Sequence, residues 1–428
     1  MAQPEAVFAW RANRSVSRLE FLQSAELVAT ALPPLDFFIN RCASRYSFAV
    51  TLAATAMRGA TCLLPSSAGE GAINMLRQRY PRSALLDDGA ISKLLCEMVR
   101  PLASPPVTRD LCLPEQVIAI AFTSGSTGEP RACPKSWGFL ASSANFCRER
   151  VGGGRAFNVV ATVPAQHMFG LEASVCTVLA AGWAMFDGPC FFPAQIVAAL
   201  ETVPRPRLLV TSPFHLRHLL ASNLELPAID VILSATAPLP LELAREAELR
   251  CGGVVQEIYG CSEAGSLGTR RTAHEAQFLP YPGVQFESCR SETGERCSVT
   301  APHLGEKITL ADQLEVNADG RFRLLGRDTD MIKVAGRRAS LSEITRILVS
   351  LAGVQDAAVF VPQQGDEARP AALVVAPGQT ESQLRAALAP LLDPIFIPRP
   401  LRIVPTLPRN ALGKLPRAEL LALLGSRG

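Results

Sequence analysis

The sequence is poor in several features that mark particular classes of protein. Only five of its 42 basic residues are lysines, and its formal net charge is +3 with no block of like charges. So small a charge gives no electrostatic basis for a nucleic-acid partner, and none is expected. The longest apolar run, Val175–Phe186, is shorter than the ~18 residues of a membrane-spanning helix, so no membrane span is expected. The N-terminal residues lack the apolar core of a signal peptide, which predicts a cytoplasmic location.

The cysteines argue against two kinds of site. All twelve are scattered, and no two show the Cys-x-x-Cys spacing that is typical of zinc sites and redox pairs. Because no export signal is recognised, we expect these cysteines to be reduced and to behave as small buried apolar residues.

The length and the apolar pattern predict an α/β protein with two domains. A chain of 428 residues is too long for one ordinary core. From Val117 onward, short apolar runs alternate with segments of helical spacing, which is typical of parallel-rich sheets covered by helices. Strands are expected at 117–122, 158–163, 207–212, 229–235 and 254–260, and helices at 213–222 and 241–251. Gly252 suits a C-terminal helix cap.

The pattern changes after Gly326 to that of a compact α+β module of ordinary domain size. Ser340 with Glu343, and Thr380 with Gln383, have the spacing of capping boxes that open helices. We therefore expect a large N-terminal domain, 1–327, and a small C-terminal domain, 328–428.

One loop points to a ligand. The segment FTSGSTGEPRACPK, Phe122–Lys135, follows a predicted strand, and its hydroxyls and glycine amides suit an anion such as phosphate. It is not a Walker loop, because only two residues separate Gly125 from Gly128. Taken alone, the loop is equally compatible with a flexible turn of small residues.

The loop is one of several motifs in which the sequence resembles the adenylate-forming superfamily of acyl- and aryl-CoA synthetases, luciferases and adenylation domains. They occur in the family's order as Thr123–Arg131, His167–Gly170, Ser234–Leu239, Tyr259–Glu263, Asp312, Gly326–Lys333 with Gly336, and Pro408–Lys414. Two departures are that arginine replaces the loop lysine at Arg131, and that Leu-Ala replaces the usual Thr-Gly before Asp312.

The resemblance implies that a carboxylate attacks the α-phosphate of ATP, with Mg²⁺ as cofactor, to give an acyl-adenylate. Cations and dipoles must then offset the charge that develops on phosphorus. The implied catalytic residues are Lys414, Glu263 (also the Mg²⁺ ligand), Ser262 and His167. The implied nucleotide-binding residues are Thr123, Ser124, Gly125, Ser126, Thr127, Gly128, Arg131, Ala235, Thr236, Ala237, Pro238, Tyr259, Asp312 and Arg327.

The resemblance also implies a second half-reaction, for which the small domain rotates about a hinge. The hinge falls at Asp328 and Thr329, and Lys333 and Gly336 then reach the site where a thiol attacks. That thiol is expected to belong to coenzyme A or to the phosphopantetheine of a separate acyl carrier protein. From Arg385 onward the sequence has seven basic and two acidic residues. This excess would suit an acidic carrier, although a solvated basic tail is an equally good interpretation.

The acid is expected to be aryl, such as a hydroxybenzoate, or medium acyl, because the residues expected around it form an apolar slot. They are His167, Phe169, Gly170, Ser212, Ala235 and Ala264. Glu172 leaves an amino-acid substrate open, since related enzymes bind the substrate amine with an acid near this motif. The more economical interpretation of Glu172 is an exposed acid in the first turn of a helix.

Two remote alternatives come from other classes. Gly260–Ala264 nearly matches the nucleophile elbow of α/β-hydrolases, but only His274 and His303 follow it as possible bases. A non-catalytic nucleotide-binding protein would have no need of both Glu263 and Lys414. His215 and His218 have helical spacing without a third ligand, which indicates packing or surface histidines.

Overall fold

The computed structural model describes residues 4–11, 14–66, 69–97, 112–123, 131–291, 294–327, 331–334, 337–362, 369–409 and 415–425. The chain divides into two compact units. The first is Met1–Val284 with Ala301–Glu306, and the second is Gln285–Thr300 with Lys307–Gly428. The predicted domain boundary at 327/328 lies inside the second unit, and as the pivot of a domain rotation it stays a prediction.

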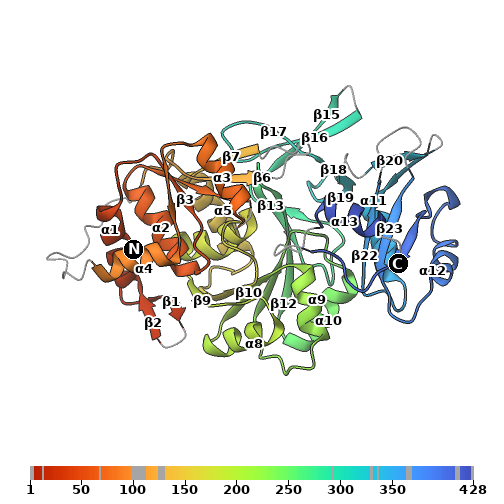
Figure 1. Ribbon diagram of the computed structural model, residues 1–428, viewed down its shortest axis with the longest axis horizontal. Helices are drawn as coiled ribbons and strands as arrows, with labels where there is room; N and C mark the ends of the chain where they lie inside the picture. Colours follow the sequence, from red (N-terminus) through yellow and green to blue (C-terminus); the bar gives the residue numbers. More distant parts are fainter. Residues whose placement is uncertain are drawn as a thin grey trace. The chain divides into compact units, whose positions relative to one another are not determined.

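The first unit contains a five-stranded sheet with the strand order β5-β3-β4-β6-β7 (Figure 1). All neighbours are parallel except β6 and β7. The strands are β3 (Phe37–Asn40), β4 (Thr61–Leu64), β5 (Ser83–Leu86), β6 (Val117–Thr123) and β7 (Arg131–Ser136). The accompanying helices are α1 (Arg18–Ala31), α2 (Arg45–Met57), α3 (Glu70–Arg79), α4 (Asp88–Glu97) and α5 (Trp137–Arg150).

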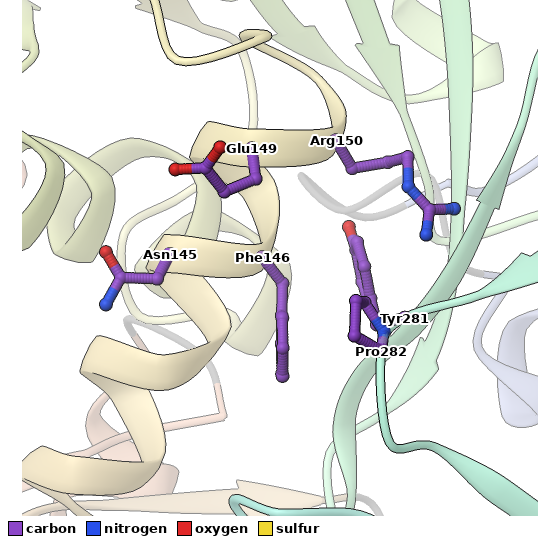
Figure 2. A pocket seen from close by; sticks show the side chains of 6 residues that line it. All are labelled: Asn145, Phe146, Glu149, Arg150, Tyr281 and Pro282. Atoms are coloured by element: carbon purple, nitrogen blue, oxygen red, sulfur yellow. The ribbon is translucent and has the colours of Figure 1, made fainter.

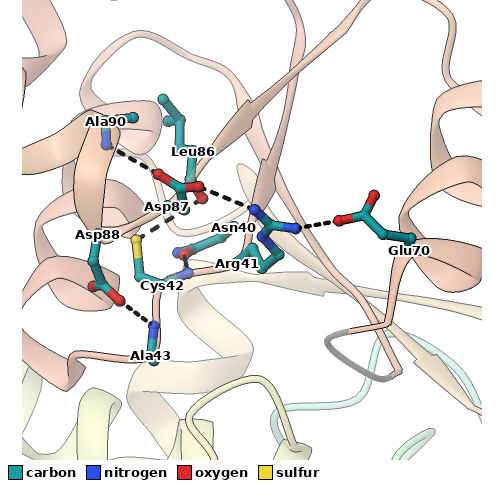
Figure 3. Close-up of polar contacts among 9 residues, drawn as sticks. All are labelled: Asn40, Arg41, Cys42, Ala43, Glu70, Leu86, Asp87, Asp88 and Ala90. Carbon is teal, nitrogen blue, oxygen red and sulfur yellow. Dashed lines mark hydrogen bonds and ion pairs between the residues drawn. The ribbon is translucent and has the colours of Figure 1, made fainter.

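Polar contacts brace the carboxyl edge of this sheet, where β3 and β5 end (Figure 3). The Arg41 guanidinium binds Glu70 at 2.7 Å and Asp87 at 3.1 Å. Asp88 accepts hydrogen bonds from the amides of Ala43 and Ser44 at the start of α2. The pKa of Asp87 is lowered first by the Ala90 amide and then by Arg41. These groups satisfy one another where β3 and β5 end, and β4 separates β3 from β6, the strand that leads into the predicted phosphate loop.

The second sheet of this unit has nine strands in the order β14-β13-β12-β11-β10-β8-β9-β1-β2. Its central neighbours, from β12 through β11, β10, β8 and β9 to β1, are all parallel. The strands are β1 (Val7–Arg11), β2 (Arg14–Ser17), β8 (Asn158–Ala161), β9 (Ala184–Asp187), β10 (Arg207–Thr211), β11 (Val231–Ser234), β12 (Val254–Cys261), β13 (Gly265–Arg270) and β14 (Leu279–Pro280).

The helices between these strands are short. They are α6 (Met168–Gly170), the π-helix η1 (Leu171–Cys176), α7 (Thr177–Ala181), α8 (Pro193–Thr202), α9 (Pro213–Ala221) and α10 (Leu241–Cys251). Pro213 lies in the first turn of α9, and Gly252 caps α10 in the left-handed conformation, as predicted. Buried Val, Leu and Ile side chains of α8, α9 and α10 pack on β10 and β11 (Figure 1).

The second unit is made of small sheets and three α-helices in its described part. Its strands are β15 (Gln285–Ser291), β16 (Gly294–Thr300), β17 (Ile308–Thr309), β18 (Asp312–Val316), β19 (Phe322–Arg327), β20 (Met331–Val334), β21 (Arg337–Ser340), β22 (Asp356–Phe360), β23 (Ala371–Val375) and β24 (Leu401–Ile403). Its helices are α11 (Leu341–Ser350), α12 (Glu381–Leu388) and α13 (Arg417–Gly425), with a 3₁₀ turn at Pro394–Phe396.

The expected helix caps of the second unit are confirmed in one case and only half formed in the other. Thr380 and Gln383 make both bonds of a capping box at α12. At α11, Ser340 accepts from the Glu343 amide at 3.3 Å, whereas its hydroxyl also contacts the Ser342 hydroxyl at 2.6 Å. No disulfide joins the cysteines in the described ranges, and most of these cysteines are buried.

Candidate active site

The parallel core of the nine-stranded sheet brings three of the recognised motifs, together with Ser212, to one edge. In a parallel sheet all strands end on the same side, and ligands bind beyond those carboxyl ends. His167 follows β8, Ser212 follows β10, Ala235 follows β11 and Ser262 follows β12. The register pairs Ala161 with Val210, and Thr211 with Ser234. Segments well separated in the sequence therefore end side by side along this edge.

The motif after β8 is held by close backbone packing. His167 is the N-terminal cap of α6 and is half-buried, while Phe169 is buried. A Cβ placed on Gly170 would lie 2.0 Å from the Pro164 carbonyl oxygen, so only glycine fits. The helix continues as the π-helix η1, a form that is frequent at functional sites.

Ser212 has a structural task at the start of α9. Its hydroxyl accepts from the His215 amide at 3.4 Å and lies 2.8 Å from Nδ1 of the same residue. Burial lowers the pKa of His215 to about 4, and His218 adds to the shift. His215 is thus a neutral, buried packing residue and His218 is an exposed surface residue, the two roles that their spacing indicated.

The segment after β11 is strained. Thr236 has φ +80°, and it is the one non-glycine residue with positive φ in the described part of the chain. Such strain is concentrated at ligand sites. The buried Ser234 hydroxyl has no hydrogen-bond partner among the described residues, whereas Ala237 and Pro238 are exposed. An exposed platform beside an unsatisfied hydroxyl fits a base with polar edges, such as adenine.

Side chains distant in sequence hold the turn between β12 and β13. Lys135 donates to the Glu263 carbonyl at 2.6 Å, and His303 Nε2 lies 3.0 Å from the Ala264 carbonyl. The Ala264 amide reaches the Cys261 sulfur at 3.4 Å. Ser262 and Glu263 themselves are half-buried, so their side chains are presented on a fixed backbone.

Glu172 is not the exposed acid that was expected. It is 4% exposed, in η1. Oε1 accepts from the Ser143 hydroxyl at 2.6 Å and from the Ser266 amide at 3.3 Å, and Oε2 accepts from the Ser266 hydroxyl at 2.8 Å. Ser143 and Ser266 supply the hydrogen-bond donors that allow this carboxylate to be buried.

Several predicted residues lie outside the described residues or have side chains that the structure does not describe. The former are Ser124, Gly125, Ser126, Thr127, Gly128, Asp328, Thr329, Gly336 and Lys414, and the latter are Thr123, Arg327 and Lys333. Arg131 begins β7 and is exposed. Tyr259 is buried in β12. Asp312 begins β18 and is the register partner of Arg327 at the end of β19, so these two predicted ribose ligands are adjacent within the second unit.

Lys135, Ser143, Ser266 and His303 were not assigned to the site from the sequence. They lie outside the recognised motifs. For Lys135 two signals were available, since lysine is scarce and this residue ends the segment Phe122–Lys135 that contains the predicted phosphate loop. It is 2% exposed and its ammonium lies 3.9 Å from the Phe139 ring centroid.

An aromatic cluster continues from this region along α5. The His303 ring lies 5.0 Å from Phe139 and 5.6 Å from Phe146, and Phe146 stacks on Tyr281 at 5.1 Å. Figure 2 shows the Phe146 and Tyr281 side chains in an open pocket, with Arg150 beyond them. Arg150 donates to the carbonyls of Leu279 and Pro280, so its charge serves mainly to join α5 to β14.

The donor set is compatible with Mg²⁺. Glu263 offers a half-buried carboxylate, a hard oxygen ligand. In the described part of the chain no group of three or more His, Cys, Asp or Glu side chains could hold an ion unaided. This fits Mg²⁺, which is usually bound by one or two carboxylates together with substrate phosphates.

The expected ribose contact can be tested separately. Asp312→Ala should weaken ATP binding by about tenfold, because hydrogen bonds to neutral hydroxyls contribute ~1 kcal/mol each. The measurement is calorimetric titration with ATP. Asp319→Ala is the control, since Asp319 is an exposed acid on the same hairpin that pairs with Arg321 at 3.7 Å. Equal ATP affinity in the two variants would place the ribose contact elsewhere.

Comparison with known proteins defines the class. Residues 40–306 match the model of the AMP-binding enzyme family, and residues 343–414 match that of the AMP-binding enzyme C-terminal domain. The chain belongs to this family, and the predicted membership of the adenylate-forming superfamily is confirmed. The predicted α/β fold, with a large N-terminal and a small C-terminal domain, is confirmed as well.

Particular relatives are consistent with this class. The chain is 30% identical over 306 residues to 4-coumarate–CoA ligase of Halorhodospira halophila, covering 68% of this chain and 73% of that one. It is 24% identical over 375 residues to 3-hydroxybenzoate–CoA ligase of Aromatoleum sp. (strain CIB), covering 76% and 68%. ATP-bound MatB from Rhodopseudomonas palustris has the same fold, with a TM-score of 0.82 at 20% identity over 99% of this chain and 96% of that chain.

The described helices were also compared with the requirements of a membrane span. Among the helices in the described ranges, none combines the length and the apolar character needed to cross a bilayer.

Proposed function

We propose that this protein activates a carboxylic acid with ATP and then transfers the acyl group to a thiol. A carboxylate oxygen attacks the α-phosphorus of ATP, the bond to the β-phosphate breaks, and pyrophosphate leaves. A thiol sulfur then attacks the acyl carbon, AMP leaves, and the thiol proton is released. The observation that carries the proposal is that three of the recognised motifs, and Ser212 beside them, follow strands that end at the carboxyl edge of one parallel sheet.

Each motif has a proposed task in the first step. Ser262 contacts the α-phosphate, and the Thr236–Pro238 segment supports adenine. Glu263 would hold Mg²⁺, which when bound neutralises phosphate charge. The loop from Thr123 to Arg131 cradles the outer phosphates. Lys414 is proposed to bridge the carboxylate and the α-phosphate as a compact point charge.

We propose an aryl or medium acyl acid without an amino group. The residues expected around the acid are largely apolar, and Phe169, Ala235 and Ala264 among them are buried. Glu172 already accepts three hydrogen bonds, and its field acts on the Lys135 ammonium. A substrate ammonium would therefore compete with an existing cation. This makes the amino-acid alternative weaker, while a hydroxybenzoate is in keeping with the names of the relatives.

Coenzyme A is the better-supported acceptor, because the relatives are named CoA ligases. The phosphopantetheine of an acyl carrier protein is a second candidate. The observation that favours it is the excess of basic over acidic residues from Arg385 onward, which would complement an acidic partner. The α/β-hydrolase alternative is not supported, because the chain belongs to the AMP-binding enzyme family.

The central test is acid-dependent exchange of labelled pyrophosphate into ATP. We expect exchange with at least one acid from a panel of hydroxybenzoates, coumarate, medium-chain fatty acids and amino acids, with amino acids the poorest. Mass analysis of the product with coenzyme A or with a phosphopantetheinylated carrier protein then identifies the acceptor. No exchange with any class of acid would contradict the proposed function.

A further inference from the structure

Lys135 is a buried cation outside the recognised motifs. It lies on β7 with 2% of its surface exposed. Its ammonium donates to the Glu263 main-chain carbonyl at 2.6 Å and lies 3.9 Å from the centroid of the Phe139 ring. Burying an ammonium is costly unless it is paired or hydrogen-bonded, so an ordinary apolar residue would fill this space more economically.

The charge that balances Lys135 is Glu172. This buried carboxylate lies more than 4 Å from the ammonium, since no ion pair joins them, yet it stabilises the charged form of Lys135 against the effect of burial. Phe139 lies between the two. Its ring contacts the Lys135 ammonium, and it also approaches the Gly265 backbone, as the Glu172 carboxylate does. Lys135 on β7 and Glu172 on η1 are thus two buried charges of opposite sign, and both elements contact the β12–β13 turn.

That turn carries the residues proposed to bind the metal and the α-phosphate. Two of its consecutive carbonyls, those of Glu263 and Ala264, are bound by Lys135 and His303. The hydrogen bond from Lys135 is charge-assisted, and such bonds are stronger than those between neutral groups. Removing it would free the carbonyl next to the Glu263 side chain.

We propose that Lys135 is a positioning residue for adenylation, whose ammonium fixes the Glu263 backbone while Glu172 balances its charge. This inference rests on the proposed function, because it assigns Glu263 to Mg²⁺ and Ser262 to the α-phosphate. It adds a residue that touches neither ligand and acts through the turn.

The test compares Lys135→Met, Glu172→Gln and the double variant. Lys135→Met removes the ammonium but keeps the length of the side chain, and it leaves Glu172 as an uncompensated buried charge. The double variant removes both charges, so its thermal midpoint should return toward that of the wild type. Its exchange rate should nevertheless stay about tenfold below wild type, with the loss concentrated in kcat and in the KM for Mg·ATP rather than for the acid.

The outcomes separate this inference from the proposed function. Exchange by the wild type tests the proposed function alone. If the wild type is active and the double variant is equally active, Lys135 is only a counter-ion and the positioning role is overturned. A double variant no more stable to heat than Lys135→Met alone would overturn the role of Glu172 as the balancing charge. Binding of Mg·ATP to the double variant, measured by calorimetry without acid, should be weakened and does not depend on turnover.

Discussion

Lys414→Ala is expected to slow pyrophosphate exchange by at least ~10²–10³-fold, the usual cost of losing one electrostatic group that acts on the transition state. In the proposed mechanism its ammonium lies between the attacking carboxylate and the α-phosphate. Both reactants are anions, so the uncompensated repulsion raises the barrier directly. Thioester formation from a supplied acyl-adenylate should be retained, because the small domain is proposed to have moved the lysine away by then.

The matched control is Lys93→Ala. Lys93 is another of the five lysines, but its side chain is 72% exposed and, among the described residues, pairs with Glu97 at 3.8 Å. Surface pairs of this kind contribute little, so this variant should exchange pyrophosphate at the wild-type rate. If Lys414→Ala slows both half-reactions equally, a single fixed site would replace the two-orientation mechanism.

Gly336 supplies the opposite arm of the same experiment. A bulky residue here is expected to leave pyrophosphate exchange intact and to slow transfer to the thiol, because a glycine allows backbone to approach a ligand closely. The measurements are exchange and single-turnover thioester formation from supplied adenylate. Loss of both activities would instead indicate a structural role for this glycine.

The strands and helices expected between Val117 and Gly260 were predictable because each is locally consistent, whereas the elements before Val117 were not predicted. The β10–α9 segment has an apolar strand, a serine cap and a proline in the first helical turn, all of which favour the observed structure. The motifs gave the family for a related reason, since each is contiguous and its spacing is fixed by one loop. Their meeting at one edge of the sheet follows from the parallel topology, because all parallel strands end on the same side.

The polar layer beneath the site was not predictable in the same way. Glu172, Ser143 and Ser266 come from η1, α5 and β13, and their hydrogen bonds depend on the packing of all three. Periodicity assigned Glu172 to an exposed turn because an acid in an apolar helix usually faces water. The π-helix changes the residues per turn and so changes which side chain points inward.

This layer leads to a stability prediction at Gly265. The residue has φ +69°, and a Cβ there would lie 2.6 Å from Glu172 Oε1 and 2.7 Å from the Phe139 ring. Gly265→Ala therefore combines backbone strain with overpacking against a buried carboxylate and a ring that is already in contact with Lys135. The strain should cost about 1 kcal/mol and the overpacking about a further 1–3 kcal/mol.

Gly252→Ala isolates the strain contribution. Gly252 has nearly the same backbone conformation, φ +71°, but no atom lies within 4 Å of its Cβ position. The measurement is the free energy of unfolding of the first unit in denaturant. Gly252→Ala should lower it only by the strain contribution, whereas Gly265→Ala should lower it by about 2–4 kcal/mol in all. The difference between the two variants then measures how tightly Glu172 and Phe139 enclose the β12–β13 turn. Equal losses would show that this turn has room to move, and the rigid backbone proposed to present Ser262 and Glu263 would no longer be supported.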